Sequence, residues 1–292
     1  MKTNGTIRAN AQELYYEVNG DGEPLVLLMG IGYDSSLWKL HQVPALSQHF
    51  EVITMDNRDV GRSGRAHAAY AISDMADDVA ALLDGLGIER AHVLGLSMGA
   101  LIGQELALRH PARVNRLVLC GPDRAPAADG FHPISVWRWV KERDETGAIF
   151  AAQQFTWLFS SSFRRNPAAV RETIEFLSSN PHPVDAEAYA RQAEAYLRYD
   201  PSGSTRAMDT PTLVIVGEQD LLTPPWVARE VAAAIPGARL EIIRGDGASH
   251  VVPLERPDDF NRLVIEFLSE ITVDAGLTLA QDDRDAYQST SY

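Results

Sequence analysis

Short apolar segments alternate with helix-like segments along most of the chain, and this alternation limits the possible folds more than any other feature. The apolar segments have the length of buried strands and span residues 25–29, 52–55, 91–96, 114–120, 212–216 and 239–243. Apolar residues recur at helical spacing in residues 72–86, 98–110, 226–235 and 258–271. Buried strands joined by helices form a parallel sheet with helices on both faces. We therefore predict an α/β fold, with residues 6–18 forming an antiparallel hairpin at one edge.

The alternation is interrupted between residues 122 and 210, where the pattern is helix-like and rich in aromatic residues. Its rings fit two interpretations: the core of a helical subdomain, or an apolar cap over a binding pocket. The rings considered as substrate contacts are Trp137, Phe155, Trp157 and Phe159. We predict that residues 1–121 and 211–274 form the core of the fold, that residues 122–210 form a helical cap, and that the polar residues 275–292 form a flexible tail.

The composition argues against several classes of function. The chain of 292 residues carries 40 acidic and 26 basic residues, and its net charge of −14 repels phosphate backbones, so we predict no binding of nucleic acid. No apolar run is long enough to cross a membrane, and the N-terminus lacks the apolar stretch of a signal peptide. The single cysteine, Cys120, rules out an internal disulfide. We expect a cytoplasmic protein, and the sequence leaves its oligomeric state open.

A Gly-Leu-Ser-Met-Gly motif at residues 95–99 carries the first chemical signal. It fits the pattern G-x-S-x-G, and it lies where an apolar strand ends and a helix begins, which is the setting of a nucleophile elbow. A Cβ atom at Gly95 or Gly99 would collide with neighbouring backbone in so sharp a turn. We therefore predict that Ser97 is presented as a nucleophile at the carboxyl end of the sheet.

A serine hydroxyl needs a base to take its proton, and histidine is the usual base. His250 lies in a loop that follows the segment 239–243 and precedes a helix, which is the expected place and chain order. His132 and His182 also follow Ser97, but they lie beside prolines in the predicted cap, where a surface role explains them. We predict His250 as the base.

An acidic residue must hold the imidazole, and it should follow an earlier strand. Asp220 lies just past the segment 212–216 and is our candidate. Two alternatives stay open: Asp123, which follows the segment 114–120, and Glu218, which is closer to the end of its strand.

Acyl transfer also needs hydrogen-bond donors for the oxyanion that forms on the carbonyl oxygen. One donor is the backbone N–H after the nucleophile, which belongs to Met98. The second comes from the loop after an early strand, and here that loop begins Met29-Gly30-Ile31. We nominate the backbone N–H of Ile31.

Together these motifs resemble the α/β-hydrolase family over residues 25–271. The resemblance includes the elbow, Val-Gly-Glu-Gln-Asp at 216–220, Gly-Ala-Ser-His at 247–250 and a turn, Asp-Asn-Arg-Asp-Val-Gly-Arg-Ser, at 56–63. It implies an eight-stranded, mostly parallel sheet with a helical cap inserted before the strand that carries the acid. The chain departs from the family at Met29, where His is usual, and at Asp59, where Gly is usual. Both departures are similar to the aclacinomycin methylesterase branch, which suggests ester cleavage.

These residues predict a serine hydrolase that cleaves carboxylic esters of apolar, small-to-medium substrates through an acyl-enzyme. Lactone opening and carbon–carbon bond hydrolysis need the same groups and remain alternatives. An alternative of another class is a non-catalytic receptor for a small molecule on the same fold. The sequence has no metal-ligand cluster and no phosphate- or dinucleotide-binding motif, so we expect no metal and no cofactor. The expected partner is a small-molecule ester or lactone.

Overall fold

The computed structural model describes residues 3–124, 132–144, 147–201 and 204–270. In these residues eight strands form one sheet, in the order β1-β2-β4-β3-β5-β6-β7-β8. The strands are β1 (Thr3–Ala9), β2 (Gln12–Asn19), β3 (Glu23–Leu28), β4 (Phe50–Met55), β5 (Ala91–Leu96), β6 (Val114–Cys120), β7 (Thr212–Gly217) and β8 (Arg239–Ile243). The predicted flexible tail, residues 275–292, lies outside the described residues.

The sheet is parallel from β4 to β8 and antiparallel at the β1–β2 edge. This confirms the predicted α/β fold with its eight-stranded, mostly parallel sheet. The predicted hairpin at the edge is also present, because β1 and β2 pair antiparallel around a tight turn. Asn10 and Ala11 form that turn with positive φ angles of 46° and 63°, as a two-residue hairpin loop requires.

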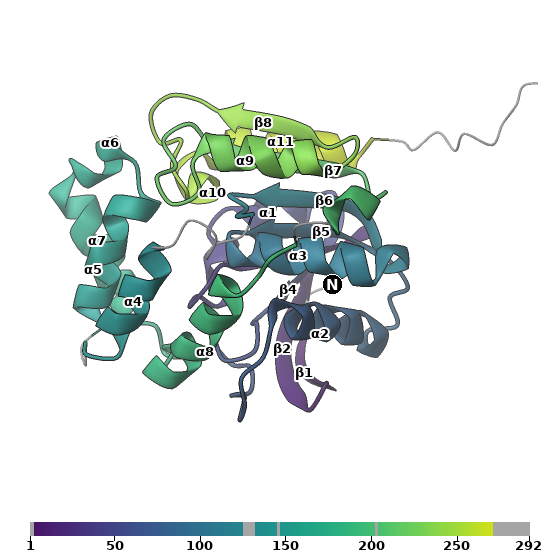
Figure 1. The fold of residues 1–292 in the computed structure, drawn as a ribbon, viewed down its shortest axis with the longest axis horizontal. Helices are drawn as coiled ribbons and strands as arrows, with labels where there is room; N and C mark the ends of the chain where they lie inside the picture. Colours follow the sequence, from purple (N-terminus) through teal and green to yellow (C-terminus); the bar gives the residue numbers. More distant parts are fainter. Residues whose placement is uncertain (1–2, 125–131, 145–146, 202–203, 271–292) are drawn as a thin grey trace, which may run out of the picture.

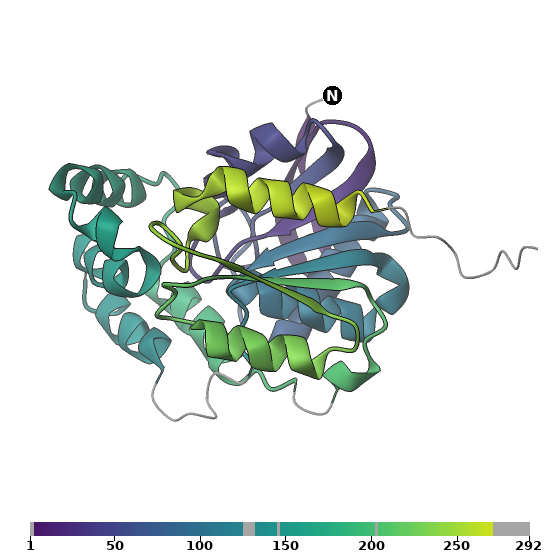
Figure 2. The same cartoon turned by 90° about the horizontal axis from the view of Figure 1, so that it is seen from above.

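Helices cover both faces of the sheet, as Figures 1 and 2 show. The core helices are α1 (Gln42–Leu46), α2 (Ile72–Gly85), α3 (Met98–Arg109), α9 (Pro225–Ala234), α10 (Val252–Glu255) and α11 (Pro257–Leu268). Successive residues of β3 point to opposite faces. Val26 and Leu28 belong to the apolar cluster that includes α2, α3 and α9, whereas Leu25 and Leu27 belong to the cluster that includes α1 and α11. A strand buried on both faces explains why its sequence is continuously apolar.

The end of α2 shows how local sequence sets an element boundary. Gly87 has a φ of 70°, the left-handed conformation that glycine adopts most readily. The N–H of Ile88 donates to the carbonyl of Leu83, and the N–H of Gly87 donates to that of Asp84. This pair of bonds is a Schellman motif, and it ends the helix just before Gly87, in agreement with the helical pattern over residues 72–86.

Five further helices lie between β6 and β7 in the chain: α4 (Pro133–Lys141), α5 (Ala148–Leu158), α6 (Ser161–Arg164), α7 (Pro167–Ser178) and α8 (Ala186–Leu197). We call them the helical segment. Figure 1 shows them gathered at one end of the sheet. In the part of the chain that the structure describes, no helix is both long enough and apolar enough to cross a membrane.

A partly buried ion pair joins the helical segment to the turn after β4. Both guanidinium nitrogens Nε and Nη2 of Arg191, on α8, donate to the carboxylate of Asp59, at 2.9 and 2.8 Å. Asp59 is fully buried and has a φ of 72°, at the position where the family usually has glycine. Its carboxylate also accepts the backbone N–H of Ala66. The side chain thus supplies bonds that glycine cannot make, and they offset the cost of the left-handed backbone.

We expect the substitution Asp59→Asn to lower the free energy of unfolding by about 2 kcal/mol, because it leaves the guanidinium of Arg191 without its charged partner. Asparagine tolerates the left-handed conformation, so the substitution tests the charge rather than the backbone. Urea denaturation measures the change.

The matched control is Asp185→Asn. Asp185 pairs with Arg65 at the surface, and asparagine still caps α8, so we expect a loss below about 0.5 kcal/mol. Equal losses in the two variants would contradict a specific role for the pair of Asp59 and Arg191.

Candidate active site

Ser97 occupies a strained turn between β5 and α3. Its φ and ψ angles are 55° and −118°, which a non-glycine residue rarely adopts. A Cβ atom added to Gly95 would lie 2.1 Å from the carbonyl oxygen of Gly99, and one added to Gly99 would lie 2.1 Å from that of Leu28. Backbone segments approach so closely here that only glycine fits. This is the geometry that the motif predicts for a nucleophile elbow.

The imidazole of His250 is hydrogen-bonded to the carboxylate of Asp220. The distance between His250 Nδ1 and Asp220 Oδ2 is 2.8 Å, and both side chains are almost fully buried. The other oxygen, Oδ1, accepts the backbone N–H groups of Leu222 and Thr223, both at 2.9 Å. The hydroxyl of Thr223 donates to Oδ2 at 3.0 Å. Four hydrogen bonds therefore fix the carboxylate. Because a carboxylate only accepts, Nδ1 carries the proton and Nε2 is left as an acceptor.

The alternative acids lie elsewhere. The carboxylate of Asp123 accepts the hydroxyl of Tyr196 at 3.0 Å and lies 3.3 Å from Nε2 of His132. Glu218 is exposed and pairs with Arg244. Among the hydrogen bonds and ion pairs of the described residues, Asp220 is the acid that contacts His250.

Ser97 and His250 line the same cavity. No hydrogen bond joins the hydroxyl of Ser97 to the imidazole within the described residues. Bonds between catalytic groups are often long in unliganded enzymes and tighten when substrate binds. The structure brings the serine, the imidazole and the carboxylate to one end of the sheet, in the chain order that the sequence indicated.

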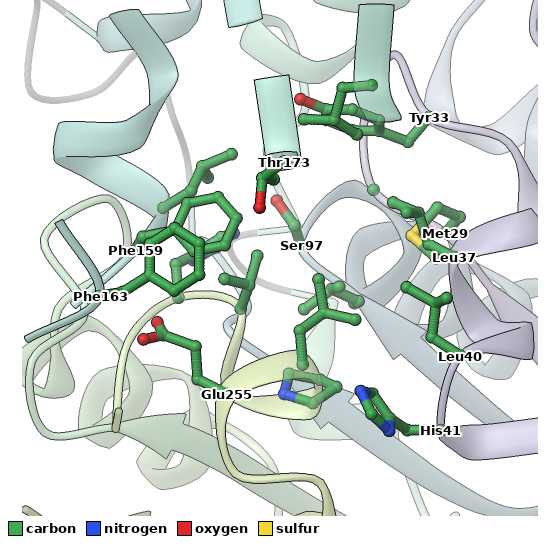
Figure 3. Close-up of a pocket in the computed structure, with 18 of the residues that line it drawn as sticks. Met29, Tyr33, Leu37, Leu40, His41, Ser97, Phe159, Phe163, Thr173 and Glu255 are labelled. Atoms are coloured by element: carbon green, nitrogen blue, oxygen red, sulfur yellow. The ribbon is translucent and has the colours of Figure 1, made fainter. Parts of the chain in front are cut away.

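The cavity has a volume of about 620 Å³, and most of its lining is apolar. Such a volume suits a small organic molecule. Figure 3 shows Ser97 between Phe159 and Phe163 on one side and Met29 and Leu37 on the other. The cavity thus extends from the serine towards both the core and the helical segment.

Two of the four rings considered as substrate contacts line this cavity, namely Trp137 and Phe159. The other two do not. Phe155 stacks behind Phe159 with ring centroids 4.8 Å apart, and Trp157 packs against the main apolar cluster. Positions 155 and 157 differ by about 200° around a helix, so they face different ways.

Much of the cavity lining could not be predicted from the sequence. Trp38 and Leu37 come from the short 3₁₀ helix η1 (Ser35–Lys39), and Phe176 comes from α7. Their sequences have no pattern that distinguishes a cavity wall from ordinary packing.

The backbone N–H groups of Ile31 and Met98 have no acceptor within the described residues. The loop that carries Ile31 is held at two points. The amide of Asn57 donates to the carbonyl of Met29 at 3.1 Å. The N–H of Gly32 donates to Oε1 of Gln192 at 2.9 Å. Side chains outside the loop thus hold it where relatives use a histidine.

Gln192 is fully buried on α8 and also donates from Nε2 to the carbonyl of Arg58, at 2.9 Å. Its neighbour Arg191 holds Asp59. One turn of α8 therefore fixes both the loop after β3 and the turn after β4. Gln192 could not be identified from the sequence, because a glutamine inside a helix has no local signature.

Among the described residues, no group of three or more His, Cys, Asp or Glu side chains is arranged to hold a metal ion.

Comparison with known proteins agrees with the α/β-hydrolase resemblance of the motifs. The family model for the alpha/beta hydrolase fold matches residues 23–257. The chain is 31% identical over 266 residues to the "Putative carbamate hydrolase RutD" of Azorhizobium caulinodans, covering 89% of this chain and 96% of that protein.

Two solved structures are also similar. The enol-lactonase from Burkholderia xenovorans LB400 is 34% identical, with a TM-score of 0.79 and coverage of 91% of this chain and 100% of that one. A thermophilic esterase from Thermogutta terrifontis is 29% identical, with a TM-score of 0.79 and coverage of 91% and 98%. The narrower resemblance to aclacinomycin methylesterases stays a prediction. From the motifs, the fold and these relatives together, the chain belongs to the α/β-hydrolase family of enzymes.

Proposed function

We propose that this hydrolase cleaves carboxylic esters of apolar, small-to-medium substrates through an acyl-enzyme. The observation that carries the proposal is that Ser97, in a strained elbow, lines the same apolar cavity as His250, whose imidazole is hydrogen-bonded to Asp220.

In the first half of the reaction, Oγ of Ser97 attacks the ester carbonyl carbon while its proton passes to Nε2 of His250. The carbonyl π electrons move to the oxygen, which becomes an oxyanion. When the intermediate collapses, the bond to the leaving alcohol breaks, and the imidazolium gives its proton to that alcohol. In the second half, water attacks the acyl-enzyme, His250 takes the water's proton, and the acid leaves as Ser97 recovers its own.

Asp220 and the free N–H groups have separate roles in this mechanism. The carboxylate of Asp220 holds the imidazole in the tautomer that leaves Nε2 free and stabilises the imidazolium. The N–H groups of Ile31 and Met98 donate to the oxyanion, and the N-terminal end of α3 favours the same negative charge.

The helical segment acts as a cap in this proposal. Trp137, Phe159 and Phe163 present rings to the cavity beside Ser97, so the acyl or alcohol group of the substrate packs against them. An apolar group placed there leaves water, which supplies the binding energy.

Lactone opening is the second candidate, and the 34% identity to an enol-lactonase favours it. A lactone is a cyclic ester, so the same steps apply, with the alcohol remaining attached to the acyl group. Comparing lactones with open-chain esters as substrates separates the two candidates.

We expect Ser97→Ala to lower kcat for p-nitrophenyl butyrate by at least about 10³-fold, because the acyl-enzyme can no longer form. Release of p-nitrophenol measures the rate. A fluorophosphonate probe should label the wild-type chain at Ser97 and leave the variant unlabelled.

The control is Ser269→Ala, which removes an exposed hydroxyl at the end of α11. A wild-type rate in the Ser97 variant would refute the mechanism. Absence of labelling together with tight binding of a small molecule would favour the receptor alternative.

We also expect Gln192→Ala to lower kcat by about tenfold with little change in KM. Loss of the acceptor for Gly32 N–H loosens the loop around Ile31, which misplaces the Ile31 N–H, a donor that matters chiefly in the transition state. Gln192 is thus a positioning residue. Steady-state kinetics with p-nitrophenyl butyrate separate kcat from KM.

Gln104→Ala is the matched control, because Gln104 is equally buried but donates to the hydroxyl of Tyr199 and does not hold the loop that carries Ile31. The conservative variant Gln192→Glu keeps an oxygen acceptor for Gly32 N–H, so it should retain more activity than Gln192→Ala. A raised KM with unchanged kcat would show that Gln192 acts on substrate binding instead.

A further inference from the structure

We propose that the cavity selects substrates whose acyl or alcohol chain is uncharged and that it rejects chains ending in a carboxylate. This inference rests on the proposed esterase function and adds a charge rule to it. It is carried by the charges that line the cavity.

The lining contains carboxylates but no Lys or Arg. Its acidic side chains are Glu172 on α7, Asp246 in the loop before His250, and Glu255 on α10. The remaining lining is mainly aliphatic and aromatic, with two imidazoles, His41 and His250. A carboxylate on the substrate would therefore find no guanidinium or ammonium partner in the cavity.

In the described residues none of these three acidic side chains forms an ion pair, although the guanidinium of Arg256 donates to the backbone carbonyl of Asp246. Glu255 accepts hydrogen bonds from Ser160 and Ser249, whose donors carry no charge. In the described part of the chain, Glu172 has neither a hydrogen bond nor an ion pair. The net charge of −14 over the whole chain adds to the negative potential.

The apolar part of the wall makes a charged chain costly as well. Phe159 and Phe163 line the cavity with ring centroids 4.4 Å apart, and Phe155 stacks behind Phe159 at 4.8 Å. A carboxylate placed against such rings loses its water and gains no hydrogen bond, whereas a methyl group gains from leaving water. Desolvation and like-charge repulsion thus both disfavour a substrate chain that ends in a carboxylate.

The test compares two esters that differ only at the far end of the acyl chain. p-Nitrophenyl hexanoate ends in a methyl group, and mono-p-nitrophenyl adipate has a six-carbon chain that ends in a carboxylate. The assay is run at pH 8, where an ordinary imidazole is uncharged. We expect kcat/KM for the hexanoate to exceed that for the adipate by at least about 100-fold. A ratio below threefold would overturn the inference.

Reversing one charge in the cavity lining tests whether the preference for hexanoate over adipate arises there. In Glu172→Lys the ratio of hexanoate to adipate should fall about tenfold, because the lysine offers the substrate carboxylate a partner. The matched variant Glu175→Lys makes the same change of charge one helical turn along α7, outside the lining, and should keep the wild-type ratio. Equal falls in both variants would trace the selection to the net charge of the chain and would overturn the role of the cavity.

Binding to the Ser97→Ala variant separates failure of this inference from failure of the proposed function. Trp38 and Trp137 line the cavity, so their fluorescence reports the binding of methyl hexanoate and monomethyl adipate. If wild type hydrolyses neither p-nitrophenyl ester but the variant prefers methyl hexanoate, the esterase proposal fails and the charge rule stands. If the variant binds both methyl esters equally, the charge rule fails, whatever the hydrolysis assay shows.

Discussion

Close contact between backbone segments at the carboxyl end of the sheet is the constraint on which the rest of the site depends. The elbow at Ser97 forms only because Gly99 lets α3 touch the carbonyl of Leu28. The strand before Asp220 also requires a glycine, because a Cβ atom on Gly217 would lie 2.3 Å from the carbonyl oxygens of Ala248 and Ser249. Backbone contact at these two glycines sets the spacing of the elements that carry Ser97, Asp220 and His250, and a side chain at either glycine would force them apart.

Elements with strong local patterns could be predicted from the sequence, and those that depend on tertiary contacts could not. The strands β5, β6 and β8 begin and end at the residues predicted for them. β5 is the clearest case, because burial at every position leaves its sequence mostly apolar. The contact between His250 and Asp220 followed from chain order and the position of each loop. The cavity wall did not, because Phe155 and Phe159 look alike in sequence and only the end of α5 decides which ring faces Ser97.

The two departures from the family pattern have a common explanation in α8. Met29 cannot brace its loop as a histidine does, and Asp59 brings a carboxylate into a buried turn. Gln192 and Arg191, adjacent on α8, supply the missing brace and the missing cation. Considered one at a time, Met29 and Asp59 are two unrelated departures from the family pattern. In the structure, adjacent residues of α8 compensate for both. The unusual residues in the core and the residues on α8 are therefore parts of one arrangement.

The helical segment consequently has two parts with different constraints. α8 is fixed, since Tyr189, Gln192 and Tyr196 are fully buried and its polar groups hold the loops around the site. α7 has no fully buried residue, yet Glu172, Thr173 and Phe176 face the cavity. Substitution on α7 changes the charge and shape of the cavity wall while costing little packing energy, because exposed positions contribute little to stability. Substitution on α8 disturbs the loop that carries the Ile31 N–H. Selectivity can thus vary along α7 while the geometry around Ser97 stays the same, which is consistent with one fold serving relatives named for carbamates, lactones and esters.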